Sequence, residues 1–376
     1  MGHKQLSIVF AGGGTGGHLF PAIAIADEVK NEEPDAKITF IGTRKKIESK
    51  VVPQHGYGFE AILVRGFRRK LALENLLFPV KFVIAFFQSI VLMRKLRPDV
   101  VVGTGGYVSG PPLFVASLLG IPTLIQEQNS YPGVTTRLLA SRASEVHLSF
   151  KSSEHYLKRR DNVHISGNPT RGVIGKISRE KAGQFFSLDA SRAVLLVFGG
   201  SLGANSINNG VLQILPHLVS RGFQIVWQTG EMDFARVDAE ATKLSRVAGG
   251  MVKVHRFIDR MEYAYAACDL AVCRAGASTV AELANAGVPS VLVPYPYAAA
   301  DHQTENARAM VELGAAVMIR DSGLTGQLLE TVEKLLGDPA KLRAMRERAL
   351  SIGKPDAAAT IARSVLRLAG SKYGRD

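Results

Sequence analysis

The sequence predicts an α/β protein made of two Rossmann-like domains, each built on a parallel sheet. Three observations support this prediction. The chain has 376 residues, which suits two domains of roughly 150–200 residues better than one. Short apolar runs alternate with helical patterns along most of its length. The succession of strand, glycine-rich loop and helix that starts at Leu6 begins again at Val194, as expected for two sets of βαβ units.

In the first half, an apolar run at Leu6–Phe10 leads into a cluster of glycines, and a helical pattern follows at Pro21–Lys30. The later apolar runs of this half are Lys37–Ile41, Glu60–Val64, Asp99–Val102, Leu113–Leu119, Thr123–Gln126 and Val146–Ser149. Short apolar runs bounded by turn residues are typical of buried strands. We therefore expect these runs to form the first parallel sheet.

The second half repeats the plan after turn residues at Gly167–Pro169, where we place the domain boundary. The domains then cover residues 1–167 and 168–356. A first strand is expected at Val194–Phe198 and a helix at Ala204–Leu218. Further strands are expected at Gln224–Gln228, Val252–Arg256, Leu270–Val272 and Ser290–Val293. A last helical segment, near residues 357–376, could pack back on the first domain.

The net charge of +13 indicates a polyanionic partner, which could be nucleic acid, anionic lipid or a phosphorylated substrate. No aromatic-rich nucleic-acid module is visible, so we expect no nucleic-acid partner. A basic cluster instead borders an apolar stretch; its residues are Arg65, Arg68, Arg69 and Lys70. The two cysteines, Cys268 and Cys273, lie in an apolar run and are expected to be core residues in a reducing cytosol.

The apolar segment Leu76–Met93 has marginal length for a membrane span and contains Pro79, Lys81 and Gln88. Two alternatives remain open for it. It could be a helix fully buried in the core, or a helix that packs on the sheet and shows an apolar face to a membrane. The neighbouring basic cluster favours the membrane-facing helix. The N-terminus runs directly into the first strand, which argues against a secretory leader.

The first glycine loop satisfies G-x-G-x-x-G with Gly12, Gly14 and Gly17. This pattern serves dinucleotides and sugar nucleotides alike. The second strand ends without the acidic residue that a nicotinamide enzyme uses to bind ribose, which argues against a dehydrogenase. His18 follows the loop at the carboxyl edge of the sheet, where it is either a general base or a histidine that hydrogen-bonds its own loop.

Other loops place polar groups after strands. Gly103–Tyr107 and Gln126–Asn129 follow strands of the first half, where amides and a carboxylate either read sugar hydroxyls or cap their own loops. Gly199–Gly203 leads into a helix whose exposed amides favour a phosphate. The string Asp269–Glu282 ends a strand in a glycine turn that opens another helix. Gln303 and Asn306 share a helix face and could bind sugar hydroxyls.

Together these strings resemble one family of bacterial glycosyltransferases. It belongs to glycosyltransferase family 28 and moves N-acetylglucosamine from UDP onto undecaprenyl-diphosphate-linked muramyl pentapeptide (lipid I), which makes lipid II for the cell wall. The resemblance spans nearly the whole chain. The matching strings are Gly13–His18, Thr104–Tyr107, Glu127–Asn129, Gly167–Arg171, Gly199–Ala204, Arg256–Asp259, Cys273–Glu282 and Asp301–Ala307. Ser278 departs from the pattern, because some members carry leucine there; only its backbone amide need act.

The resemblance implies the GT-B fold, two Rossmann-like domains facing a cleft. The first domain would take the lipid acceptor through its glycine loops, with Gly105, Gly106, Tyr107 and Glu127 on the acceptor side. The second domain would hold UDP-N-acetylglucosamine, with the Ile258 backbone at the uracil and Glu282 at the ribose. The remaining residues implied to bind substrate are Thr15, Gly16, Gly17, Asn129, Arg171, Ser201, Ala277, Ser278, Thr279 and Gln303.

The expected reaction inverts the donor sugar, with His18 as general base; Glu127 or a water chain is the alternative base. No Asp-x-Asp motif is present, so no metal and no cofactor are expected. The resemblance also implies docking on an anionic membrane at the cytoplasmic face of the inner membrane, and possible contact with cell-wall synthesis machinery. The alternatives are a GT-B enzyme that glycosylates diacylglycerol, a sugar-nucleotide epimerase and a non-catalytic membrane scaffold.

Overall fold

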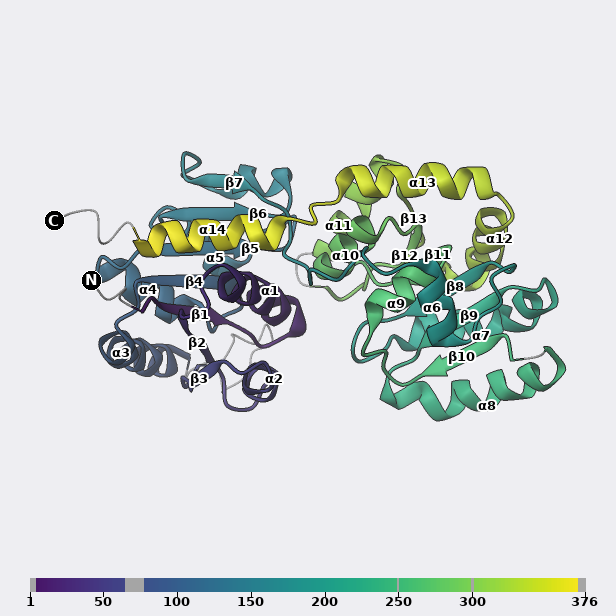
Figure 1. Ribbon diagram of the computed structural model, residues 1–376, viewed down its shortest axis with the longest axis horizontal. Coiled ribbons are helices and arrows are strands. Elements are labelled where there is room, and N and C mark those ends of the chain that lie inside the picture. Colours follow the sequence, from purple (N-terminus) through teal and green to yellow (C-terminus); the bar gives the residue numbers. More distant parts are fainter. Residues whose placement is uncertain (1–4, 65–77, 249, 299–300, 371–376) are drawn as a thin grey trace. The chain divides into compact units, whose positions relative to one another are not determined.

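The computed structural model describes residues 5–64, 78–248, 250–298 and 301–370. The chain forms two compact units, and each has its own sheet (Figure 1). Unit 1 contains the residues up to 172 together with those from 355 onward, and unit 2 contains residues 173–354. The predicted α/β class with two Rossmann-like sheets is confirmed.

Unit 1 is built on a parallel sheet of seven strands in the order β3-β2-β1-β4-β5-β6-β7. The strands are β1 (Ser7–Gly12), β2 (Lys37–Gly42), β3 (Gly58–Ala61), β4 (Val100–Gly105), β5 (Thr123–Glu127), β6 (Glu145–Leu148) and β7 (Val163–Ile165). The order reverses between β1 and β4. In doubly wound sheets, ligands bind beyond the carboxyl ends of the strands at such a reversal.

Helices cover both faces of this sheet. On one face lie α1 (Gly16–Glu32), α2 (Glu48–Gln54) and α14 (Ala357–Gly370). On the other lie α3 (Phe78–Leu96), α4 (Gly110–Leu118) and α5 (Val134–Leu139). The run at 113–119 is thus mostly helical rather than a strand, because two parallel neighbours such as β4 and β5 need a crossover between them.

The C-terminal helix α14 belongs to unit 1 although the chain reaches it through unit 2. It packs against α1. Its residues Ile361, Val365 and Ala369 are fully buried in the same cluster as Ile8 and Phe10 of β1. Their spacing of four residues puts them on one helix face, which explains why this helix needs the sheet of unit 1 as a partner.

Unit 2 repeats the design with a parallel sheet of six strands in the order β10-β9-β8-β11-β12-β13. The strands are β8 (Val194–Phe198), β9 (Gln224–Gln228), β10 (Val252–His255), β11 (Leu270–Cys273), β12 (Ser290–Leu292) and β13 (Ala316–Met318). Here the order reverses between β8 and β11. The free thiols of Cys268 and Cys273 are buried.

The helices of unit 2 cover this sheet. They are α6 (Arg179–Phe186), α7 (Asn205–Ser220), α8 (Glu231–Ala248), α9 (Met261–Ala267), α10 (Ala277–Ala286), α11 (His302–Glu312), α12 (Leu324–Leu336) and α13 (Pro339–Ile352). Those from α7 to α11 also connect its strands. The core cluster on one face includes Trp227, which is fully buried and whose indole N–H donates to the Asn208 side chain. This bond satisfies the one polar atom of the largest core residue.

Candidate active site

In unit 1, the glycine loops predicted from the sequence follow β1 and β4, the two strands that flank the reversal of strand order. The first loop ends in the first turn of α1, which carries Gly16, Gly17 and His18. The Thr104 hydroxyl of β4 donates to the His18 carbonyl oxygen at 2.9 Å. The two loops are therefore joined at the position where a Rossmann-like unit binds its ligand.

The His18 ring is half-buried, and one of its nitrogens is bonded within unit 1. Its Nδ1 lies 3.1 Å from the Thr104 carbonyl oxygen and 2.9 Å from Oε1 of Gln128. Nε2 has no hydrogen-bond partner among the described residues. The histidine thus bonds its own surroundings through Nδ1 alone.

Two glycines make room for this ring. Gly105 has φ +98°, and a Cβ added there would lie 2.8 Å from His18 Nδ1. Gly106 has φ +76°, and a Cβ there would lie 2.7 Å from the Gly13 carbonyl oxygen. Both positions need a residue without a side chain, in a conformation that only glycine adopts readily. Tyr107 follows them, and its ring lies next to Gly14.

A buried carboxylate that our sequence reasoning missed holds the first loop. Glu48, at the start of α2, is fully buried. It accepts hydrogen bonds from the Gly14 amide at 3.0 Å, the Thr43 amide at 3.0 Å and the Thr43 hydroxyl at 2.7 Å. A Cβ at Gly13 would meet this carboxylate at 2.6–2.9 Å. In the sequence, Glu48 looks like an ordinary first-turn acid, so only its burial reveals its role.

Glu127 has a similar supporting position at the end of β5. It is 2% exposed and accepts from the Asn129 amide and side chain, the Gly133 amide and the Thr136 hydroxyl at 2.6–3.2 Å. Four donors leave this carboxylate little capacity to take a proton from a substrate. The Glu127 carboxylate therefore holds the loop that carries Asn129.

In unit 2, the corresponding reversal of strand order lies between β8 and β11. Two loops lie there at the carboxyl edge of the sheet. The loop Gly199–Gly203 leads from β8 into α7, and Gly276 leads from β11 into α10. Ala277, Ser278 and Thr279 are the first residues of α10, so their amides have no acceptor within the helix. The Ser278 hydroxyl is buried and has no partner among the described residues. These groups form a site suited to an anion.

Gln228, at the end of β9, supports both the glycine loop and the predicted uracil contact. Its Nε2 donates to the Gly200 carbonyl oxygen at 2.9 Å, and its Oε1 accepts from the Ile258 amide at 2.8 Å. The Ile258 amide is therefore occupied, and its carbonyl oxygen is the backbone group left for a base. Ser201, on the same loop, is exposed.

The predicted sugar and ribose residues of unit 2 differ in accessibility. Glu282 is half-buried, and the Tyr265 hydroxyl donates to its Oε2 at 2.9 Å, which orients the carboxylate. Gln303 accepts from the Tyr295 amide at 2.9 Å through Oε1. Asn306 is fully buried and donates to the Ala275 carbonyl oxygen, so it supports the turn before α10 rather than meeting a sugar.

The predicted residues thus gather at two sheet edges. Those before residue 173, including Thr15, Asn129 and Arg171, belong to unit 1, and those after it belong to unit 2. Arg171 is half-buried near the end of unit 1. Among the described residues, no group of three or more histidine, cysteine or acidic side chains could hold a metal ion.

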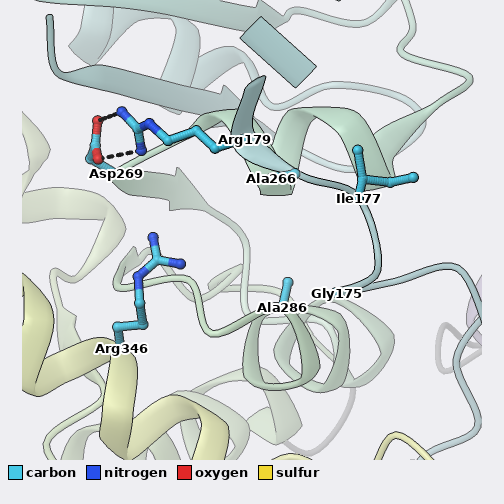
Figure 2. Close-up of a pocket in the computed structure, with 7 residues that line it drawn as sticks. All are labelled: Gly175, Ile177, Arg179, Ala266, Asp269, Ala286 and Arg346. Atoms are coloured by element: carbon cyan, nitrogen blue, oxygen red, sulfur yellow. Dashed lines mark hydrogen bonds and ion pairs between the residues drawn. The ribbon is translucent and has the colours of Figure 1, made fainter. Parts of the chain in front are cut away.

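A pocket of about 360 Å³ lies at the opposite, amino edge of the unit 2 sheet (Figure 2). There Arg179 makes a two-bond ion pair with Asp269, at 2.6 and 2.8 Å, and Asp269 also accepts from the Val194 amide. The pair ties α6 to β11. The residues that line the pocket are Gly175, Ile177, Arg179, Ala266, Asp269, Ala286 and Arg346. None of the predicted site residues lies there, so we assign this pocket no part in the reaction.

Exposed apolar side chains lie on α3, α4 and α5, of which α4 packs against both α3 and α5. On α3, Val83, Phe87 and Val91 are 50–64% exposed, whereas Ala85 and Met93 are buried. The other exposed apolar residues on or beside α4 and α5 are Leu118, Leu119, Val134 and Leu138. The predicted apolar helix is therefore not fully buried. The basic cluster at 65–70 lies outside the described residues. Among the residues that the structure describes, no helix is long and apolar enough to cross a bilayer.

Both halves of the chain match one enzyme family. Residues 8–148 match the glycosyltransferase family 28 N-terminal domain, and residues 194–361 match the C-terminal domain of that family. The chain therefore belongs to glycosyltransferase family 28, whose two-sheet architecture is GT-B. Within it, the chain belongs with the N-acetylglucosamine transferases described next, as the sequence strings predict.

The similarity to these transferases covers nearly the full length. The UDP-N-acetylglucosamine–N-acetylmuramyl-(pentapeptide) pyrophosphoryl-undecaprenol N-acetylglucosamine transferase of Chlorobaculum tepidum is 48% identical over 97% of this chain and 100% of that protein. The enzyme of the same description from Flavobacterium psychrophilum is 39% identical over 98% of this chain and 99% of that protein. The crystal structure of Acinetobacter baumannii MurG superposes with a TM-score of 0.75 at 30% identity, covering 96% of this chain and 99% of that one.

Proposed function

We propose that this enzyme transfers N-acetylglucosamine from UDP-N-acetylglucosamine to an undecaprenyl-diphosphate-linked muramyl pentapeptide, with inversion at the transferred sugar. The relatives named for this activity match 97% of the chain. The observation that carries the mechanism is the environment of His18, which bonds unit 1 through Nδ1 and leaves Nε2 without a protein partner.

In this mechanism, unit 1 activates the acceptor. The acceptor hydroxyl donates to His18 Nε2, and its oxygen attacks the anomeric carbon of the donor sugar. As the new bond forms, the hydroxyl proton passes to Nε2, and the bond between the sugar and UDP breaks. A positioned general base of this kind contributes roughly 10²–10⁴-fold to the rate. The buried Glu127 supports the neighbouring loop instead of competing for the proton.

Unit 2 holds the donor and stabilises the leaving diphosphate. The free amides of Ala277, Ser278 and Thr279 point the positive end of the α10 dipole at the phosphates, and the exposed Ser201 hydroxyl adds a donor. Glu282, oriented by Tyr265, is suited to the ribose hydroxyls. Gln303 has its Oε1 bonded to the Tyr295 amide, so its Nε2 is the group suited to the donor sugar.

The test is transfer of labelled N-acetylglucosamine from UDP to a polyprenyl-diphosphate-muramyl-pentapeptide analogue. We expect transfer by the wild type and a loss of about 10²-fold or more for His18→Ala, with UDP binding by calorimetry unchanged. EDTA is expected to leave the rate unchanged. No transfer to this acceptor, together with intact UDP binding, would contradict the proposed acceptor, and diacylglycerol would then be tried.

We also propose that the apolar surface of α3, α4 and α5 docks on an anionic membrane at the cytoplasmic face of the inner membrane, close to cell-wall synthesis machinery. Its support is the exposed stripe Val83, Phe87 and Val91 together with the net charge of +13. The double variant Phe87→Ser, Val91→Ser should lose most of its binding to phosphatidylglycerol vesicles. Met232→Ser, which removes a side chain 95% exposed on α8, is the matched control. Equal binding by all three proteins would refute the assignment of this surface.

A further inference from the structure

The two partners of His18 Nδ1 are both oxygens, which has a consequence for the position of its proton. One is the Thr104 carbonyl oxygen, and the other is Oε1 of Gln128. A carbonyl oxygen only accepts hydrogen bonds. If the amide of Gln128 has a fixed orientation, Nδ1 must therefore carry the ring hydrogen of the neutral imidazole, and Nε2 must carry the lone pair.

The orientation of Gln128 is fixed by a chain of bonds beneath it. Gln128 is 2% exposed, and its Nε2 donates to the Thr104 carbonyl oxygen at 2.7 Å and to Oε1 of Gln126. If the amide were turned over, its oxygen would face these two acceptors. Two oxygens without a hydrogen between them repel each other, and both would lose their donor in a buried place.

The same reasoning fixes Gln126. This residue is fully buried, and its Nε2 donates to the Ser149 hydroxyl oxygen at 3.3 Å. The Ser149 hydroxyl uses its only hydrogen on the Glu127 carbonyl oxygen at 2.9 Å, so it accepts from Gln126. The chain is thus anchored at both ends on backbone carbonyl groups, those of Glu127 and Thr104, which cannot turn over.

We propose that Gln128, held by Gln126 and Ser149, is a positioning residue that sets the tautomer of His18, so that Nε2 is the atom that takes the proton of the acceptor hydroxyl. The proposal rests on the transferase function above. The direction of every hydrogen bond in the series follows from the Glu127 carbonyl group, which only accepts. Ser149 donates to this group, and Gln126 donates to Ser149. Gln128 then donates to Gln126, and His18 donates to Gln128. Because both partners of Nδ1 are oxygens of neutral groups, the imidazole is oriented without a carboxylate bonded to Nδ1.

The direct test is a ¹⁵N spectrum of the full-length protein with labelled histidine, which distinguishes a ring nitrogen that carries hydrogen from one that carries a lone pair. His18 is assigned by subtraction of the His18→Ala spectrum. We expect Nδ1–H in the neutral wild-type ring. In Gln128→Met, only the longer contact of 3.1 Å to the Thr104 carbonyl oxygen remains, so we expect part of the rings to carry the hydrogen on Nε2 instead. A neutral ring with hydrogen on Nε2 in the wild type would overturn the inference, whatever the enzyme transfers.

Kinetics provide the second test. Gln128→Met should lower kcat/KM by about 10-fold or more, which is less than the effect of His18→Ala. In the His18→Ala background, the same substitution should have almost no further effect, because Gln128 acts through His18. Gln224→Met removes another buried glutamine, which bonds Asp189 in unit 2, and should leave the rate unchanged.

The outcomes separate the two proposals. Additive losses in the double variant would show that Gln128 acts otherwise than through His18, and would overturn the positioning role. Hydrogen on Nδ1 in the wild type, together with full activity of His18→Ala, would keep the tautomer assignment but remove the base from the proposed function.

Discussion

The two glycine loops that open the sheets have the same sequence plan but are held by opposite means. In unit 1, the loop after β1 is held through its Gly14 amide by the buried carboxylate of Glu48. In unit 2, the loop after β8 is held through its Gly200 carbonyl oxygen by the neutral amide of Gln228. The first arrangement uses a loop amide and places negative charge behind the loop. In the second, Gln228 bonds a carbonyl oxygen, so it occupies no loop amide and adds no charge.

This difference explains why similar glycine patterns need not bind similar ligands. A phosphate that approaches the unit 2 loop and the start of α10 meets free amides and the positive end of a helix dipole. A phosphate beside Gly13 and Gly14 would lie near a carboxylate in a low-dielectric environment, where like charges repel strongly. The comparison therefore supports unit 2 as the donor diphosphate site.

The largest expected effect comes from Gly203→Ala in the unit 2 loop. Gly203 has φ +78°, and an added Cβ would overlap the Thr229 carbonyl oxygen. Strain combined with a backbone clash should cost about 3 kcal/mol or more and abolish UDP binding. Gly200→Ala is the control: its φ is +91°, but a Cβ there meets open space, so only about 1–2 kcal/mol of strain is expected. Equal destabilisation of both variants, measured by urea unfolding, would mean that the loop relaxes around the clash.

A smaller effect is expected for Glu48→Gln in unit 1. The amide supplies one accepting oxygen where three donors need partners, so one or more of them is left unsatisfied in a buried place. The free energy of unfolding should fall by about 1–3 kcal/mol, and hydrogen exchange of residues 12–17 should quicken. Glu240→Gln, at a surface carboxylate 51% exposed, is the control and should change neither quantity. Unchanged exchange in Glu48→Gln would show that the carboxylate does not hold the loop.

The smallest effect is expected for Gln228→Glu, which tests whether the charge beside a glycine loop decides its ligand. Gln228→Glu would place a carboxylate behind the unit 2 loop, as Glu48 lies behind the unit 1 loop. We expect UDP to bind about 10-fold more weakly, or roughly 1.4 kcal/mol, by calorimetry. Gln228→Met also removes the donor to the Gly200 carbonyl oxygen, and in addition leaves the Ile258 amide without its acceptor, but adds no charge, so it should weaken UDP binding less. If both variants bind UDP equally, the loop geometry rather than its charge decides the ligand.

The sequence predicted both sheets and the positions of the glycine loops, because strand periodicity and glycine clusters are local signals. It also predicted the apolar helix at 76–93, and the exposure of Phe87 and Val91 removes the fully buried alternative. It did not reveal the supports of the loops. Glu48 and Gln228 gain their roles from burial and from partners that come from other elements.

Residues within the sequence strings that match the family also differ in burial and in hydrogen bonding. Asn306 and Gln303 share a helix and a polar character, yet only the structure shows that Asn306 is fully buried. Likewise, Glu127 resembles a base in the sequence, but four donors surround it in the fold. Hydrogen-bond saturation is a property of three-dimensional packing, which a residue pattern does not encode.

The return of α14 to unit 1 also affects how the chain is completed during synthesis. Unit 2 comes from one continuous stretch, residues 173–354, whereas the core of unit 1 includes Ile361, Val365 and Ala369. On the ribosome, the part of the chain that starts first is therefore the last to obtain all its core residues. The N-terminal sheet must wait with one side of α1 uncovered until the final helix emerges, so a premature stop near residue 355 would damage the unit that was translated first.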